Sequence, residues 1–211
     1  ARWDVVGRAM EVMRSQFTKK INDDGWHTLI SAGVDRNILI YDDDAAASTF
    51  SKRLVSLMKL TMRRNGGGNS SSINRGKMTD LFMSPEGIEN IRNWGVDEVD
   101  DVTRRELITQ EGGLLSRIFQ VTLHDLDELG DGQEYENFYE NDLGGTLPAG
   151  DTEIVVGLDM SRNDSFVMPV RAGLQIFEDD TLHRQRRAGF YGWAEQGFAV
   201  LDNRRVLIGA F

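Results

Sequence analysis

Residues 79–94 read TDLFMSPEGIENIRNW and contain a strand, a helix cap and a helix in succession. The first part, residues 79–83, combines β-branched, aromatic and aliphatic side chains in the manner of a strand. Ser84 can cap the following helix with its hydroxyl, and Pro85 suits the first helical turn because no N–H donor is needed there. We expect this helix to extend to about Trp94. The stretch therefore predicts a strand that is followed directly by a capped helix.

The sequence on the C-terminal side of this stretch is mostly β in character. Residues 118–121 form one strand-like piece, and clearer strands are predicted at 154–158, 166–168 and 174–177. Residues 199–209 are predicted to form two strands joined by a tight polar turn. No internal repeat is evident. Since helices dominate the first part and strands the last, the pattern predicts the α+β class.

A long amphipathic helix is predicted at the N-terminal end, over residues 4–22. Apolar residues recur there every three or four positions and share one face: Val6, Met10, Met13, Phe17 and Ile21. We expect that face to be buried, and Arg14 and Lys19 to be exposed on the other side. Two aspartates followed by Gly25, which can adopt left-handed backbone geometry, predict the end of the helix.

A short strand at 37–41 and a second helix are predicted next. The helix should be capped near Ser48 or Thr49 and end at residues 63–65, where arginines suit the negative end of the helix dipole. Its buried stripe is predicted to contain Phe50, Leu54, Leu57 and Met58. The glycine- and serine-rich stretch 66–72 has little to bury, so we expect a mobile loop within a domain.

Composition excludes several classes of protein. Of 211 residues, 40% are hydrophobic and 27% charged, which are ordinary proportions for a folded chain. The sequence contains no cysteine, so disulfides, thiolate metal sites and a thiol nucleophile are impossible. No apolar run is long enough to span a membrane. The 24 basic and 34 acidic residues give a net charge of −10, which disfavours a protein that binds nucleic acid tightly. The same charge suits a protein whose surface encloses DNA without binding it.

The sequence predicts no catalytic, cofactor or metal site. The histidines are scattered without metal-ligand spacing: His27, His124 and His183. The acidic run Asp42, Asp43 and Asp44 lacks the alternating ligands of a calcium loop and is interpreted as a solvated turn. The glycine runs at Gly66 and Gly112 lack the Lys-Ser/Thr signature of a phosphate loop, and no nucleophile elbow is present.

The densest basic cluster of this acidic chain lies at residues 183–187. Arg184, Arg186 and Arg187 are candidates for contact with a neighbouring subunit, meeting acidic residues such as 97–101 or 42–44. A solvated loop is an equally good interpretation of the cluster. Nucleic acid is a third, less favoured partner because no aromatic side chains interleave the basic ones.

The order of elements resembles the major capsid proteins of tailed bacteriophages, which have the Hong Kong 97-like fold. The helix at 4–22 resembles the spine helix of that family's peripheral domain, and residues 79–94 resemble the strand, Ser-Pro and helix of its axial domain. Residues 186–209, RRAGFYGWAEQGFAVLDNRRVLIG, resemble strands that return to the peripheral domain. The resemblance implies three parts: residues 1–45 with the spine helix, 46–175 as the axial domain, and 176–211 as returning strands.

The resemblance also implies a function. The chain would be no enzyme and need no cofactor. It would assemble with itself, as pentamers and hexamers of an icosahedral virion shell, and enclose a phage or prophage genome without sequence-specific binding. Portal, scaffold or protease proteins would be further partners, assembly would take place in the host cytoplasm, and no membrane would be involved. The family's N-terminal arm and extended loop are not found before the spine helix, so we expect a truncated or processed chain.

Two alternative functions remain open at the level of sequence. An encapsulin-like compartment shares the implied fold but encloses enzymes instead of a genome. A hydrolase or ligand-binding α+β domain, with a site assembled from scattered polar residues, belongs to a different class. Such an enzyme would need a deep pocket containing acids or bases with shifted pKa values.

Overall fold

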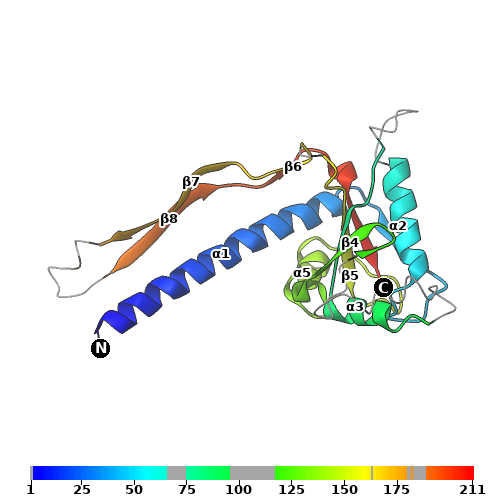
Figure 1. Cartoon of the computed structure of the whole chain (residues 1–211), viewed down its shortest axis with the longest axis horizontal. Helices are drawn as coiled ribbons and strands as arrows, with labels where there is room; N and C mark the ends of the chain where they lie inside the picture. Colours follow the sequence, from blue (N-terminus) through cyan, green and yellow to red (C-terminus); the bar gives the residue numbers. More distant parts are fainter. Residues whose placement is uncertain (1, 66–74, 96–116, 163, 180–181, 183–188) are drawn as a thin grey trace. The chain divides into compact units, whose positions relative to one another are not determined.

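The computed structural model describes the chain except for residues 1, 66–74, 96–116, 163, 180–181 and 183–188. Its helices and mixed sheet (Figure 1) confirm the predicted α+β class. The chain forms two compact units. Unit 1 contains Ala1–Thr28 and Phe166–Val200, and unit 2 contains Leu29–Ser165 and Leu201–Phe211. Each unit is therefore built from segments that are distant in the sequence.

Helix α1, Arg2–Val34, supplies the helical part of unit 1 with its residues up to Thr28. The predicted helix over 4–22 is confirmed, but its predicted end at Gly25 is wrong, since the helix continues past this residue. One glycine inside a helix costs only about 1 kcal/mol relative to alanine. A Cβ atom at Gly25 would lie 3.2 Å from the Phe198 ring, so the glycine permits a close approach of these two residues.

The predicted apolar stripe of α1 is confirmed in its spacing but not in its depth. Most residues next to the stripe in the helix are exposed. The five members of the stripe itself are half-buried: Val6, Met10, Met13, Phe17 and Ile21. Arg14 and Lys19 are exposed, as predicted. The stripe therefore marks the less exposed face of the helix, but its side chains do not form a fully buried core.

A two-stranded antiparallel ribbon completes unit 1, formed by β7, Val170–Glu178, and β8, Phe190–Gln196. The predicted strand 174–177 lies inside β7. Leu174 is half-buried, and a Cβ atom at Gly192 would meet both Leu174 and Met13 at 3.2 Å, so this face of the ribbon packs on α1. Two short strands, β6 at Phe166–Val167 and β9 at Ala199–Val200, pair at the base of the ribbon.

Unit 2 is built on a six-stranded sheet with the order β1-β10-β5-β2-β4-β3. The strands are β1 Leu39–Ile40, β2 Asp80–Met83, β3 Arg117–Ile118, β4 Val121–Asp125, β5 Ile154–Leu158 and β10 Val206–Ala210. The neighbours β2 and β4 run parallel, as do β1 and β10, whereas the other pairs are antiparallel. Every residue of β5 and β10 is buried, so these strands form the middle of the unit.

Two helices flank this sheet. Helix α3, Pro85–Arg92, begins as predicted, with the Ser84 hydroxyl accepting a hydrogen bond from the Gly87 N–H at 3.1 Å. Helix α2 is Lys52–Asn65, and its cap differs from the prediction. The Ser51 hydroxyl accepts from the Leu54 N–H at 3.0 Å, so Ser51 caps the helix and not Ser48 or Thr49.

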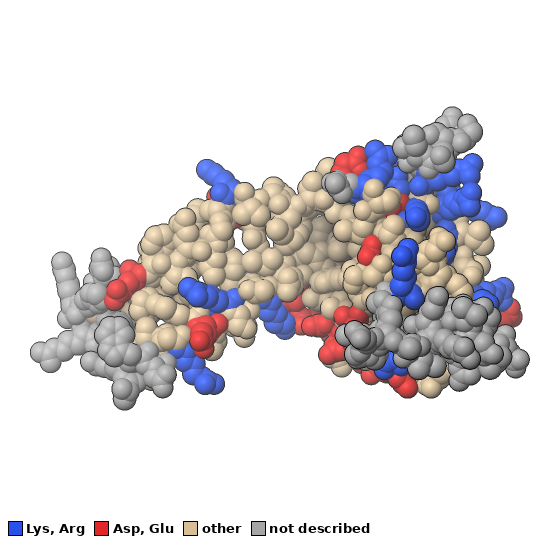
Figure 2. Space-filling model, in the orientation of Figure 1, with Lys and Arg blue, Asp and Glu red and all other residues tan. Residues whose placement is uncertain are grey.

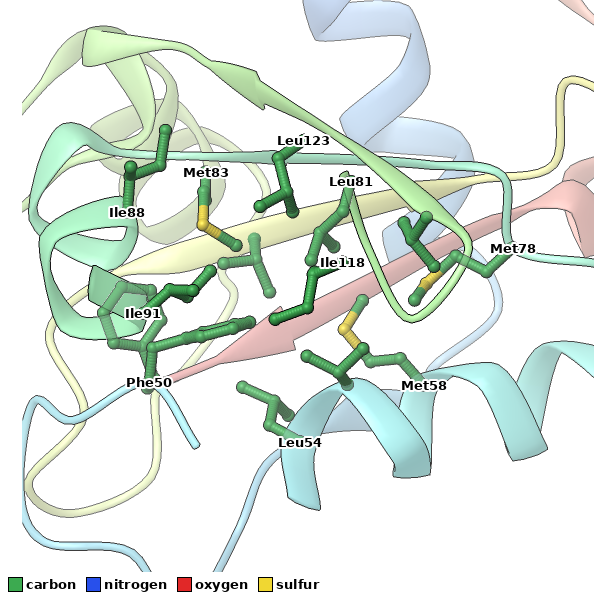
Figure 3. Packing of buried hydrophobic residues seen from close by; sticks show 14 of the residues in the cluster. Phe50, Leu54, Met58, Met78, Leu81, Met83, Ile88, Ile91, Ile118 and Leu123 are labelled. Atoms are coloured by element: carbon green, nitrogen blue, oxygen red, sulfur yellow. The ribbon is translucent and has the colours of Figure 1, made fainter. Parts of the chain in front are cut away.

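The hydrophobic core of unit 2 lies between α2, α3 and the sheet (Figure 3). Three of the four residues predicted for the α2 stripe are fully buried, namely Phe50, Leu54 and Met58, whereas Leu57 is only half-buried. The Phe50 ring stacks on Trp94 at 6.2 Å between ring centroids. It also meets the ring of the C-terminal Phe211 edge-on at 5.3 Å. The residue pairs thus join the segment just before α2, the segment just after α3 and the C-terminal residue in one aromatic cluster.

Two predictions about strands are wrong. Residues 118–121 form no single strand, because Phe119 and Gln120 adopt positive φ angles of 46° and 67° and turn the chain from β3 into β4. The two strands predicted within 199–209 do exist, but they do not pair with each other. The short 3-10 helix η5, Asn203–Arg205, separates them, so β9 pairs with β6 and β10 joins the large sheet.

Three further short helices follow β4 in unit 2. They are η2 Asp127–Leu129, α5 Glu134–Asn137 and the π-helical turn η3 Phe138–Asp142. The compact units divide the chain at other residues than the predicted ranges 1–45, 46–175 and 176–211. The assignment of those ranges to peripheral and axial domains stays a prediction. The predicted mobile loop at 66–72 lies outside the described residues.

Candidate functional site

The polar groups buried in unit 2 hold its elements together. Arg205 and Asp159 form an ion pair whose side chains are 2% and 0% exposed. Burial alone would raise the pKa of Asp159, but hydrogen bonds from Ser161, from the Lys77 N–H and from Arg205 outweigh it and lower that pKa. The pair joins the end of β5 to η5 and to the segment before β2. We interpret it as a structural link.

A second buried link connects α3 with the C-terminus. The Ser84 hydroxyl donates a hydrogen bond to the Glu153 carboxylate while it accepts one from Gly87. The backbone of Glu153 in turn pairs with that of Phe211. Burial, with further repulsion from Glu86, raises the pKa of Glu153, although the Ser84 hydrogen bond opposes this. Both Ser84 and Glu153 are thus engaged in structural contacts.

The histidines and the acidic turn give no metal centre within the described ranges. His124 lies 2.8 Å from an Asp80 oxygen and stacks on the Phe82 ring, while His183 is outside the described residues. In the acidic turn, Asp42 accepts a hydrogen bond from Ser51 and pairs with Arg53. Asp43 and Asp44 are exposed, so the predicted solvated turn is confirmed for these two residues only.

The most distinctive polar feature of unit 2 is a cavity of about 760 Å³ beside α2, which we call the basic groove. Every charged residue that lines it, among those described, is a lysine or arginine: Lys52, Lys59, Arg63, Arg75 and Lys77. Figure 2 shows lysine and arginine side chains gathered at the upper right, over α2. A concentration of positive charge in a chain with net charge −10 points to a surface for an anionic partner.

Helix periodicity and strand periodicity together build the groove. Lys52, Lys59 and Arg63 are separated by seven and four residues, so they share one face of α2. Arg75 and Lys77 alternate with buried residues in the extended segment before β2 and therefore project to the same side. Sequence reasoning missed this site because its charges come from segments that are not adjacent in the chain.

Two close contacts shape the floor and the wall of the groove. A Cβ atom at Gly76 would lie 2.3 Å from the Met62 carbonyl oxygen, so only glycine lets this segment approach α2 so closely. The Lys59 ammonium donates to the Phe119 carbonyl at 2.6 Å, which fixes the β3–β4 turn at one side. Burial, and then the charge of Lys77, lowers the pKa of Lys59. Positive groups thus converge and repel each other in this groove.

A region that carries only negative charge follows β4. We call these residues, 125–142, the acidic segment. Every Asp, Glu, Lys or Arg in it is acidic: Asp125, Asp127, Glu128, Asp131, Glu134, Glu136, Glu140 and Asp142. Glu136 is buried, and burial followed by repulsion from Glu140 raises its pKa. The pKa of Asp125 is raised by burial and then by Asp127. Charge repulsion is therefore built into this segment too.

Unit 1 exposes aromatic side chains on the outer face of its ribbon. Phe177 pairs with Tyr191 across β7 and β8, and their rings stack at 5.4 Å. Trp193, opposite Gln175, lies on the same face and is 48% exposed. We call Phe177, Tyr191 and Trp193 the aromatic face. Clustered exposed aromatic residues are typical of interaction surfaces.

The predicted contact residues Arg184, Arg186 and Arg187 lie outside the described residues, and so does the predicted acidic partner 97–101. A second cavity of about 490 Å³ in unit 2 is lined mostly by apolar residues and glycines, and among the described residues its titratable side chains are Tyr41 and Tyr139. In the part of the chain that the structure describes, no helix is long and apolar enough to cross a membrane.

No family model matches the chain, and no curated protein matches it. Solved structures are similar to it in fold. A structure from Mycobacterium phage Che8 has a TM-score of 0.53 at 10% identity over 94% of this chain and 61% of its own. The capsid of an empty GTA particle gives 0.48 at 13% identity over 82% and 50%. Mycobacterium phage Ogopogo gives 0.46 at 12% identity over 97% and 71%.

The chain thus spans between half and 71% of the lengths of these three structures. The Che8 likeness covers nearly all of this chain and concerns the fold. It shows that this chain shares the fold of that phage structure.

Proposed function

We propose that this chain is the structural subunit of a tailed-phage capsid, which assembles with copies of itself into the shell of the virion. The observation that carries the proposal is the fold shared with the Che8 phage structure over 94% of the chain. The GTA structure in the comparison is itself named as a capsid. In this proposal the protein performs no catalysis, and its function depends on the surfaces through which copies contact one another.

The architecture of unit 1 favours a role in assembly. An isolated two-stranded ribbon is only marginally stable in water, and β7–β8 covers just one of its faces with α1. The aromatic face is left exposed on the other side. A neighbouring subunit that covers this face would remove apolar surface from water, at about 25 cal/mol for each Å².

A shell also explains why modest contacts suffice. Each subunit of a closed shell meets several neighbours, so weak contacts add up through multivalency. Under this proposal the shell encloses a genome without reading its sequence, and assembly in the host cytoplasm belongs to the same proposal. Portal, scaffold and protease partners stay predictions.

Electron microscopy of the chain, alone and within its complete gene product, tests the proposal. We expect rings, sheets or closed shells of regularly repeated subunits. A monodisperse monomer at every concentration, in both forms, would contradict a shell role and favour the alternative of a ligand-binding or hydrolytic domain.

The contents of purified particles separate a virion shell from an enzyme compartment. Particles purified after expression with the neighbouring genes should contain nucleic acid that resists nuclease until the shell is opened. Particles filled with a single co-purifying enzyme, and free of nucleic acid, would instead support the encapsulin-like alternative.

A further inference from the structure

We propose that the basic groove of one copy receives the acidic segment of a second copy, in a head-to-tail contact between unit 2 of neighbouring chains. The groove is lined by lysines and arginines from α2 and from the segment before β2. The acidic segment, residues 125–142, is the complementary surface. This contact supplies the proposed shell with a partner surface and rests on that proposed function for its setting.

The topology of the sheet places the two surfaces at opposite ends of unit 2. Strands β2 and β4 are parallel neighbours. Residues 75–78, before β2, and the Phe119–Gln120 turn, before β4, line the groove at the ends where these strands begin. The acidic segment starts at Asp125, where β4 ends. Figure 2 agrees, with basic side chains over α2 and acidic ones lower down near α5.

This separation means that the acidic segment of one copy does not meet the basic groove of the same copy. The five residues of β4 lie between the two surfaces, which is about 13 Å of extended chain from first to last residue. Each copy therefore offers a basic surface at one end of unit 2 and an acidic surface at the other. A contact between unlike patches is heterologous, and such contacts form rings when the rotation between copies closes.

The charges of the groove are available to a partner. None of the described residues forms an ion pair with Arg63, Arg75 or Lys77, and all three are exposed. Asp127, Asp131 and Asp142 of the acidic segment are exposed as well. Repulsion within each surface would be relieved when the two meet. A nucleic-acid backbone is a weaker candidate, because the net charge of −10 repels it.

A charge-swap experiment tests the contact. The groove variant carries Arg63→Glu, Arg75→Glu and Lys77→Glu, and the acid variant carries Asp127→Lys, Asp131→Lys and Asp142→Lys. In sedimentation at low salt, wild type should self-associate, and each variant alone should associate about 10-fold more weakly or worse. Mixing the two variants should restore association, since each then offers the surface that the other lacks.

A matched control comes from the same helix. Arg64 is exposed on α2 next to Arg63 but does not line the groove, so Arg64→Glu should leave self-association unchanged. Far-UV circular dichroism should show that all variants remain folded. Self-association of wild type should also weaken between low and high salt, because the Debye length falls to about 8 Å at 0.15 M.

Three outcomes would overturn the inference. In the first, wild type does not self-associate at low salt. In the second, the mixed variants associate no better than either alone. In the third, a short DNA duplex binds wild type and loses binding in the groove variant, while self-association persists in that variant.

Failure of this inference and failure of the proposed function are distinguishable. Ordered particles that persist in the groove variant would overturn the contact and leave the shell role standing. Charge-swap association without ordered particles under any condition would support the contact and contradict the shell.

Discussion

Units 1 and 2 use the same kinds of residue in opposite ways. All fully buried hydrophobic side chains of the described residues belong to unit 2, from Ile30 to Phe211. In unit 1 the apolar stripe of α1 reaches only half-burial, and the ribbon exposes Tyr191 and Trp193. Unit 2 therefore has a core of its own, whereas unit 1 has an amphipathic surface that is incompletely covered. Unit 2 is thus the part of the chain that supplies most of its buried apolar surface.

The comparison predicts the largest loss of stability when the core of unit 2 is truncated. Phe50→Ala removes a ring that is 0% exposed and contacts Trp94 and Phe211, so it should cost about 3–5 kcal/mol of unfolding free energy. Urea denaturation measures this loss. Leu60→Ala, at a residue of α2 that is 49% exposed, is the matched control and should change stability by less than about 0.5 kcal/mol.

Breaking the buried ion pair should cost about 3 kcal/mol or more at neutral pH. Asp159→Ala leaves the Arg205 charge buried, with Asp202 at 3.6 Å as its remaining acidic partner among the described residues. The pKa of Asp159 is lowered in the folded state, so its contribution is present above the ordinary value of 3.8. It should be lost as the pH falls through the folded pKa. Equal stability of variant and wild type at pH 7 would contradict the structural role.

The matched truncation in unit 1 should be milder. Phe17 is half-buried, so Phe17→Ala should cost about 1–2 kcal/mol and not the 3–5 kcal/mol of a fully enclosed phenylalanine. Denaturation in the dissociated state gives this value. If Phe17→Ala were as destabilising as Phe50→Ala, the contrast between the units would fail.

Removing the buried charge of Glu153 should stabilise unit 2 slightly. Glu153→Gln keeps an acceptor for Ser84 and should add about 0.5–1 kcal/mol at pH 7. Because burial raises the pKa of Glu153, the folded state favours the protonated form. The advantage of the variant should therefore shrink as the pH falls through the raised pKa, and vanish below 4.5. Thermal unfolding across that range tests the sign.

The smallest effect on stability is expected at the aromatic face. Trp193 is 48% exposed, so Trp193→Ser should change the unfolding free energy by less than about 0.5 kcal/mol. The same change should weaken self-association, if a neighbour covers this face as proposed. Analytical ultracentrifugation separates the two readouts. A large loss of stability without loss of association would show that the face serves unit 1 internally.

Local patterns in the sequence predicted local structure well. The Ser84 cap, the Pro85 start and the spacing of the α1 stripe all depend on groups within a few residues of one another, and all are found. Burial of Phe50 and Leu54 followed from the same helical periodicity. Where the deciding interaction joins residues that are close in the sequence, the amino acids alone determine the secondary-structure element and which of its faces is buried.

Only the tertiary structure decided the rest, because the deciding partners are distant in the chain. Helix α1 continues through Gly25 against Phe198, and β9 pairs with β6 instead of β10. The basic groove likewise forms only when α2 and the segment before β2 lie side by side. The positive charges that line the groove repel one another. They are held close together because the apolar residues beneath them pack in the core, and this packing joins segments that are distant in the sequence.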